Sequence, residues 1–135
     1  MERRKKLVGV LVSVSDPNTG KKRESATATR IEFEDSLDDF YRLIGCNCVD
    51  IVTRKVYDAK KPFAIILDDN GLLYGDAITS AVTFHEKQNR FVERLVGNLL
   101  IVKDGEEGEL ASLDESEVKA ILASHKRRGI LTLAI

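Results

Sequence analysis

Alternation of apolar and polar residues dominates the first third of the chain and predicts β-strands. Residues 7–14 are apolar and β-branched, and they run into the turn-forming stretch 16–20. Residues 26–33 alternate with the period of two that a half-buried strand shows, and residues 46–56 alternate again. We therefore expect an opening hairpin from the first two stretches and a third strand over 46–56.

The pattern also predicts two helices, because apolar residues recur there every three or four positions. The first runs over residues 37–44 behind Ser36 as the N-cap, and Gly45 ends it. The second starts at Ser112-Leu113-Asp114-Glu115, which matches a capping box with the serine as the N-cap. Gly129 is expected to end this helix.

The remaining apolar runs predict further strands. Residues 63–67 and 72–74 flank Asn70-Gly71, which is the strongest short signal for a hairpin. Residues 95–103 and 130–135 are each predicted to form one strand.

The order of these elements places the chain in the α+β class. The sequence holds more hairpin signals than strand–helix–strand spacings typical of βαβ units. Residues 76–94 show no consistent apolar pattern and are not assigned. A length of 135 residues, with 43% hydrophobic and 32% charged residues, suits one globular domain. We expect a single domain over residues 1–135, with a mainly antiparallel sheet of about five to seven strands and two short helices.

Charge and segment lengths indicate a cytoplasmic protein without a membrane partner. The 21 Lys and Arg nearly cancel the 22 Asp and Glu, which leaves a formal net charge of −1 and no whole-chain attraction for nucleic acid. The longest apolar runs, such as residues 95–102, are far shorter than the ~20 residues of a membrane helix. The basic start at residues 3–6 is followed by no signal-peptide cleavage site.

Basic residues are nevertheless concentrated near the start of the chain. Residues 1–30 hold eight Lys or Arg and three acids, whereas residues 104–117 hold seven acids and no base. Nucleic-acid binding is therefore an alternative function. The residues that would contact phosphate are Arg3, Arg4, Lys5, Lys6, Lys21, Lys22 and Arg23. In the expected hairpin the first four lie at the opposite end from the last three, so two separate solvated clusters explain the same residues.

Thiols and imidazoles offer one candidate metal site. Cys46, Cys48, His85 and His125 have the chemistry that zinc prefers, but the two isolated histidines lack the paired spacing of a zinc site. The cysteines fall two apart in the strand predicted over 46–56, too close for a relaxed disulfide. We therefore expect free cysteines and no zinc.

Carboxylates offer a second candidate site. Asp68, Asp69 and Asp76 flank the predicted turn and would supply oxygen ligands to a divalent cation in a small metal-dependent hydrolase. Turns select aspartate without any ion, because its side chain binds the local backbone. The chain holds no nucleophile elbow, P-loop, dinucleotide fingerprint or paired-histidine metal motif. We predict no catalytic residue, no metal and no cofactor, and a protein that is not an enzyme.

Several phrases of the sequence match a known family. They are the strand, turn and strand of Leu7 to Phe33, the helix of Leu37 to Gly45, Ile66-Leu67-Asp68-Asp69-Asn70-Gly71-Leu72-Leu73, Leu95-Val96-Gly97-Asn98-Leu99-Leu100-Ile101-Val102 and Gly108-Glu109-Leu110-Ala111-Ser112-Leu113. Through them, over about residues 7–125, the chain resembles an uncharacterised family of small proteins carried by phages and conjugative elements of Clostridia and related Firmicutes, known only as a domain of unknown function. That family usually shows paired glycines and an Ile-Glu after its first helix, where this chain has Gly45-Cys46-Asn47-Cys48-Val49-Asp50.

The resemblance implies a bacterial cytoplasm and an accessory role in a mobile element, beside antirestriction functions. No catalytic residues are established for that family, so none carry over to this chain. We expect a non-catalytic protein-binding or interaction module that acts on a host or element protein. Nucleic-acid binding through the basic N-terminal third is the alternative, and a small metal-dependent hydrolase is a further one.

Overall fold

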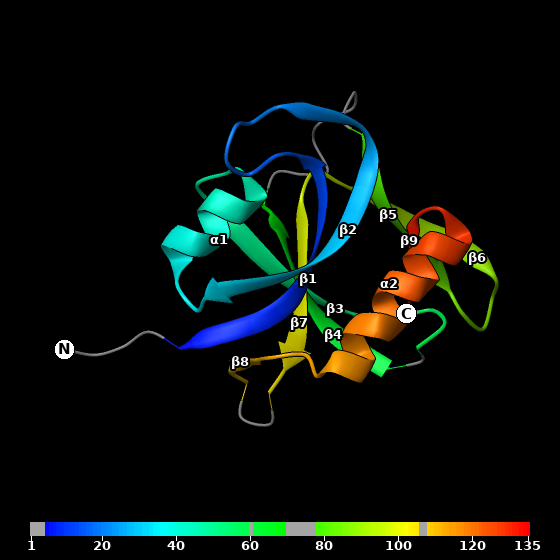
Figure 1. Ribbon diagram of the computed structural model, residues 1–135. Coiled ribbons are helices and arrows are strands. Elements are labelled where there is room, and N and C mark those ends of the chain that lie inside the picture. Colours follow the sequence, from blue (N-terminus) through cyan, green and yellow to red (C-terminus); the bar gives the residue numbers. More distant parts are fainter. Residues whose placement is uncertain (1–4, 60, 70–77, 106–107) are drawn as a thin grey trace.

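The computed structural model describes residues 5–59, 61–69, 78–105 and 108–135. These residues form nine strands and two helices (Figure 1). In chain order they are β1 (Lys6–Ser15), β2 (Lys22–Glu34), α1 (Leu37–Ile44), β3 (Val49–Val56), β4 (Lys61–Asp68), β5 (Thr79–His85), β6 (Arg90–Val96), β7 (Leu99–Asp104), β8 (Leu110–Ala111), α2 (Glu115–Arg128) and β9 (Leu131–Ala134).

The strands follow the order β2-β1-β7-β4-β3-β9-β5-β6, and β8 pairs with β7 outside this path. The expected sheet-rich α+β fold with two helices is confirmed for the described part of the chain. The prediction of a mainly antiparallel sheet with five to seven strands is wrong, because the sheet is mixed and the described residues form nine strands. Its parallel pair is β5 with β9. This pair arises because α2 carries the chain across the sheet before β9 inserts between β3 and β5.

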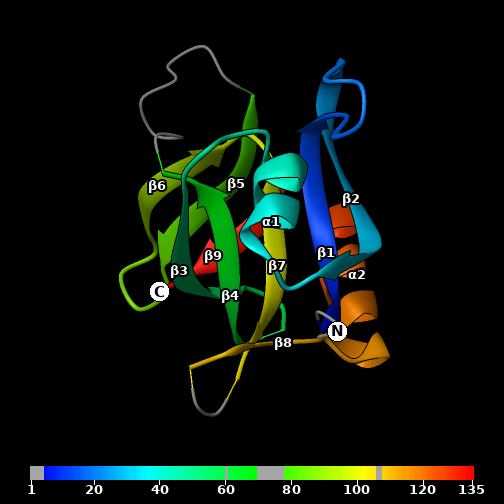
Figure 2. The ribbon, with the colours of Figure 1, turned by 90° about the vertical axis from the view of Figure 1, so that its left-hand side faces the viewer.

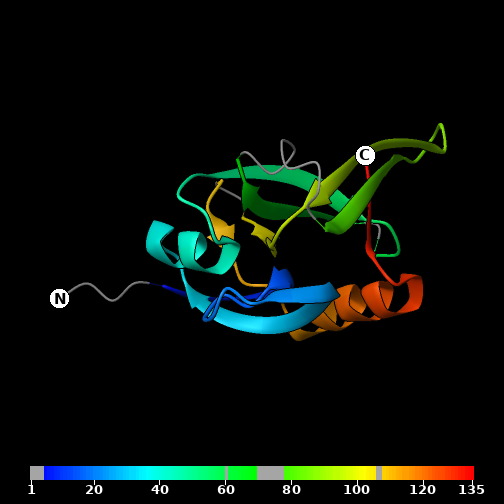
Figure 3. The ribbon, with the colours of Figure 1, turned by 90° about the horizontal axis from the view of Figure 1, so that it is seen from above.

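A helix packs on each face of the sheet (Figure 2). α1 covers β2, β1, β7 and β4, where its Phe40, Leu43 and Ile44 are buried in one core cluster. α2 lies on the opposite face, where Val118 and Ile121 join a second and larger cluster. The sheet curls, so that the β1–β2 hairpin and the strands β3 to β5 form facing walls (Figure 3). The larger cluster fills the space that these walls and α2 enclose.

The predicted opening hairpin is confirmed, and β1 pairs with β2 from Lys6 opposite Glu34 to Ser15 opposite Lys22. The predicted hairpin of residues 63–67 with 72–74 is wrong over residues 64–66. These β4 residues already pair with β3 on one edge and with β7 on the other. Residues 70–77, which include the Asn70-Gly71 turn, lie outside the described part of the chain.

The single strand predicted over 95–103 is instead the end of β6 and most of β7. Gly97 has a φ of 76°, a left-handed conformation that reverses the chain at little cost for glycine. The next residue, Asn98, is 2% exposed. Its Oδ1 accepts hydrogen bonds from the Val14 and Ser15 backbone N–H groups at 2.8 and 3.2 Å. Its Nδ2 donates to the carbonyl oxygens of Ser15 at 3.1 Å and Leu43 at 2.8 Å.

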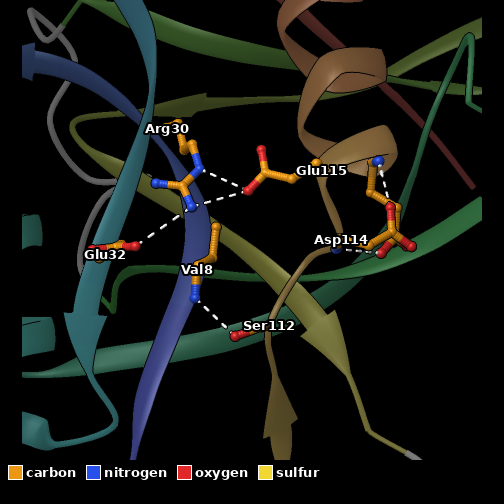
Figure 4. A network of polar contacts seen from close by, with 7 residues as sticks. Val8, Arg30, Glu32, Ser112, Asp114 and Glu115 are labelled. Atoms are coloured by element: carbon orange, nitrogen blue, oxygen red, sulfur yellow. Dashed lines mark hydrogen bonds and ion pairs between the residues drawn. The ribbon is translucent and has the colours of Figure 1, made fainter.

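The first helix is confirmed at both ends, and the second begins later than predicted. Ser36 Oγ accepts a hydrogen bond from the Asp39 N–H, and Gly45 ends α1 with a φ of 80°. The predicted N-cap at Ser112 is wrong. Its hydroxyl accepts a hydrogen bond from the Val8 N–H of β1 at 2.9 Å instead (Figure 4). Asp114 is the N-cap of α2 and forms the capping box with Glu117.

Two further differences concern strand limits. The strand predicted over 46–56 begins only at Val49, so both cysteines lie in the loop before β3 and their placement in a strand is wrong. The unassigned residues 76–94 contain β5 and most of β6. The register of this pair shifts near Ser80 and near Val92. Such bulges break the alternation on which a sequence-based assignment depends.

Candidate binding surfaces

Strands β9, β5 and β6 carry no described helix on the face that α1 covers elsewhere. α1 packs over β2, β1, β7 and β4, and it also contacts β3, whose Val49 packs against the same cluster. The register places side chains of four strands in one row here, namely Lys55, Ala134, Phe84 and Phe91. We call this surface the open face and define it by Ile51, Thr53, Lys55, Val82, Phe84 and Phe91.

The open face exposes large apolar side chains. Ile51 is 48% exposed and Phe91 is 53% exposed, although both lie within strands. Phe91 packs edge-to-face on Phe84 with ring centroids 6.0 Å apart, which fixes its position at the end of the sheet. Exposed apolar side chains that gather on one rigid surface are typical of interaction sites. The open face therefore combines exposed apolar side chains with regular strands.

Ion pairs brace the same strands. Arg54 of β3 binds Glu93 of β6, with its Nη2 2.8 Å from Oε1, and both side chains are largely buried. Lys55 Nζ lies 3.9 Å from Glu86 Oε2. These pairs tie β3 to the β5–β6 hairpin across the short β9. Three of these four side chains lie on strands, and Glu86 lies in the turn between β5 and β6.

The predicted nucleic-acid-binding residues form two separate groups in the structure. Lys5 and Lys6 lie at the start of β1, whereas Lys21, Lys22 and Arg23 lie at the other end of the β1–β2 hairpin. Nine residue steps of β1 separate the groups, about 30 Å. Arg3 and Arg4 lie outside the described residues.

A shallow hollow of about 380 Å³ lies at the second of these groups. It is lined by Asp16, Lys21, Lys22, Arg23, Glu24, Ser25 and Thr27. Arg23 Nε donates to Ser13 Oγ at 3.1 Å, so this guanidinium is held against the hairpin. Three cations and two carboxylates share the hollow, which leaves one excess positive charge.

The cysteine and histidine candidates do not assemble into a metal site in the described part of the chain. No group of three or more His, Cys, Asp or Glu side chains is placed there to hold a metal ion. Cys46 and Cys48 are free, and Cys46 Sγ donates to the Cys48 carbonyl oxygen at 3.3 Å. Burial raises the pKa of the Cys46 thiol, and the negative charge of Asp68 adds to the shift.

The carboxylate candidates are only partly described. Asp68 ends β4 and Asp69 follows it, with its N–H bound to the Cys48 carbonyl oxygen at 3.1 Å. Asp76 lies outside the described residues. The hydrolase alternative therefore stays a prediction.

Charged side chains at the two ends of α2 join distant parts of the chain. Near its start, Glu117 lies 2.7 Å from Lys61 Nζ and 2.9 Å from Lys103 Nζ. Burial alone would raise the pKa of Glu117, but these partners and the Asp114 N–H outweigh it and lower the pKa. Near its end, Arg128 binds both carboxylate oxygens of Asp58 at 2.8 and 2.9 Å.

The Asp58 carboxylate is bound by side chains of α2. Hydrogen bonds from Arg128 and then Ser124 hold the pKa of Asp58 well below its usual range. Arg127 Nη2 adds a third contact at 3.2 Å. Arg128 also stacks over the Tyr57 ring, 4.5 Å from its centroid. We infer that this cluster holds the end of α2 against the residues that follow β3.

The open face was missed by sequence analysis. Ile51 is one apolar residue in an alternating strand, and such a residue is normally directed into a core. Phe84 and Phe91 fall in the stretch that received no assignment. The sequence offered one signal, because Ile51 shares its side of the alternating strand with the polar Thr53 and Lys55.

The structure thus defines an α+β protein with a curled mixed sheet and one helix on each face, in which no described helix covers β9, β5 and β6 on the α1 side. The family model described as a domain of unknown function, DUF3846, matches residues 10–126, so the chain belongs to the DUF3846 family. The resemblance to a family known only as a domain of unknown function is confirmed to this extent. No curated protein and no solved structure matches the chain. Neither described helix is long and apolar enough to cross a membrane.

Proposed function

We propose that this protein is a non-catalytic protein-binding module, and that the open face is its binding surface. The observation that carries the proposal is the exposure of Ile51 and Phe91 on a sheet face with no described helix over it. Burying such side chains against a partner contributes roughly 25 cal/mol per Å² of apolar surface. The rigid strands beneath them lose little conformational entropy on binding.

We further propose the setting that the family resemblance implies. The partner is a host or element protein in a bacterial cytoplasm, and the module is an accessory of a phage or conjugative element. The absence of a catalytic motif from the sequence supports a binding role over an enzymatic one.

A pull-down with matched variants tests the binding surface. Tagged wild-type protein, Ile51→Lys and Leu37→Lys are used as baits in extract of a host bacterium, and captured proteins are quantified by mass spectrometry. Leu37 is 58% exposed but lies on α1, away from the open face, so its variant is the control. We expect one reproducible partner with the wild type and with Leu37→Lys, and its loss with Ile51→Lys. Failure to recover any partner would count against the function.

Nucleic-acid binding is the second candidate, supported by the hollow beside Lys21, Lys22 and Arg23. Phosphate contacts by these side chains would release counterions, so affinity would fall steeply with salt. A gel shift with mixed DNA and RNA at low salt compares wild type with the triple variant Lys21→Ala, Lys22→Ala, Arg23→Ala. Retardation that the triple variant abolishes supports this candidate. No retardation at about micromolar protein removes it.

A further inference from the structure

β3 is paired unequally on its two edges. Toward β4, all eight residues from Val49 to Val56 have a partner. Toward β9, only Lys55 and Val56 are paired, opposite Ala134 and Leu133. In the described part of the chain, residues 49–53 therefore present a free strand edge in the interior of the sheet order. This edge borders the open face at Ile51.

The backbone groups along this edge can be assigned from the pairing. The Tyr57 N–H, which follows β3, donates to the Thr132 carbonyl oxygen at 3.0 Å. In an antiparallel pair, the N–H and C=O of one residue point to the same neighbouring strand, and those of the next residue point to the opposite side. Because the Tyr57 N–H points to β9, the backbone groups of the other odd-numbered residues of β3 point to the β9 side as well. The N–H and C=O groups of Ile51 and Thr53 thus point to the free edge.

Side chains occupy these positions in place of a strand. The Ile51 N–H donates to Asp50 Oδ1 at 2.8 Å. The Thr53 carbonyl oxygen accepts a hydrogen bond from Arg54 Nη1 at 2.8 Å. Both bonds are local and exposed, so an incoming backbone can replace them at small cost. Two of the four backbone groups at Ile51 and Thr53 are thus bonded to side chains that an incoming strand can displace.

We propose that residues 49–53 of β3 accept an extended, basic segment of a partner protein as an added strand in line with β9. This inference rests on the proposed protein-binding function and names how the partner is held. Backbone groups of the segment replace the Asp50 and Arg54 side chains on Ile51 and Thr53. An apolar side chain of the segment packs beside Ile51, and its neighbours point to the opposite face.

Charge at this end of β3 selects a basic segment. Arg54 and Lys55 are already paired with Glu93 and Glu86. Asp50 of β3 and Asp69, which follows β4 and binds the Cys48 backbone just before β3, have no ion pair with a described residue. The carboxylate of Asp50 is released when the added strand takes over the Ile51 N–H. Lysine or arginine on the segment satisfies it, whereas the phosphates of a nucleic acid are repelled.

Two peptides of eight residues test the proposal with the full chain. One alternates lysine with valine, and the other has glutamate in place of each lysine. Binding is followed by amide chemical shifts and by hydrogen exchange. We expect saturable binding of the lysine peptide, exchange at Ile51 and Thr53 slowed by about tenfold or more, and at least tenfold weaker binding of the glutamate peptide. Equal binding of both peptides, or protection elsewhere than β3, overturns the proposal. So does preferential binding of single-stranded oligonucleotide to this edge.

Variants separate the edge from the rest of the surface. Thr53→Pro removes an N–H that no described strand uses, so the fold is retained while an added strand is blocked. Asp50→Lys reverses the selecting charge, and Glu24→Lys makes the same change on the distant edge strand β2. We expect loss of peptide binding with Thr53→Pro, about tenfold weaker binding with Asp50→Lys, and no change with Glu24→Lys. An equal loss with Glu24→Lys overturns the proposal.

The outcome for this edge is distinguishable from that for the proposed function. If Ile51→Lys abolishes capture of a host protein but Thr53→Pro leaves capture unchanged, strand addition is wrong and the protein-binding function stands. If the lysine peptide binds β3 as described but no host protein is captured, the edge is supported and the proposed function fails.

Discussion

Asn98 joins three segments through one buried side chain. Its amide binds the backbone at the end of β1 and at the end of α1, while its own residue begins the turn into β7. Asn98→Ala leaves these buried backbone groups without partners, so we expect a loss of about 2–4 kcal/mol in the free energy of unfolding. Urea unfolding followed by circular dichroism measures it. Asn47→Ala, in an exposed loop, is the control, and an equal loss there would contradict this role.

His125 makes stability depend on pH near neutrality. Burial of the imidazole lowers the pKa of His125 below its usual 6.5. The unfolded chain therefore takes up this proton at a higher pH than the folded protein. The contribution of neutral His125 is complete above about pH 6.5 and is lost as the pH falls from there toward the lowered pKa.

The free energy of unfolding should therefore decrease as the pH falls from about 6.5, by no more than about 1.4 kcal/mol per pH unit for one proton. Urea titrations at several pH values measure this slope. His125→Leu removes the titrating group and should flatten the curve over this range. A slope that persists unchanged in His125→Leu shows that another group is responsible.

At the scale of elements, the start of α2 depends on a charged cluster. Glu117 is 6% exposed and accepts from two lysines and from the Asp114 N–H. Glu117→Ala removes the capping box and leaves Lys61 and Lys103 without this partner. Because both lysines are partly exposed, solvent offsets part of the loss, and we expect destabilisation of about 1–3 kcal/mol. Thermal unfolding compared with Glu115→Ala, whose carboxylate is on the surface, measures the difference.

Elements that depend on local signals were predictable from the sequence, and those that depend on distant partners were not. α1 has its cap at Ser36 and its stop at Gly45 within ten residues, and both were found. The start of α2 was misplaced because the Ser112 hydroxyl is used by Val8, more than a hundred residues away. β5 and β6 were missed because each carries a bulge.

At the scale of the whole molecule, the binding surfaces depend on which faces remain uncovered. The separation of the two basic clusters followed from the hairpin, which the sequence predicted. The open face could not be predicted in this way, because the exposure of Ile51 depends on how far α1 extends over the sheet. Folding also brings oppositely charged segments of the chain together. Arg30 of the basic first segment lies 2.9 Å from Glu115 of the acidic later one, so part of each is neutralised (Figure 4).

The whole sheet depends on its last strand. β9 lies between β3 and β5 and is the connection through which β5 and β6 join the other strands in the sheet order. Leu131 and Leu133 are fully buried in the larger core cluster. A charge placed at Leu133 therefore destabilises the larger core cluster and the pairing of β9 with β3 and β5.

We expect Leu133→Asp to destabilise the protein by more than about 4 kcal/mol, because it buries an unpaired carboxylate among apolar side chains. Ile135→Asp, two residues further along and 44% exposed, is the matched control and should cost less than about 0.5 kcal/mol. Circular dichroism reports overall folding, and hydrogen exchange of residues 79–96 reports whether β5 and β6 stay attached. If Leu133→Asp kept slow exchange in residues 79–96, β9 would not be what holds β5 and β6 in the sheet, and the Arg54–Glu93 and Lys55–Glu86 pairs would have to hold them alone.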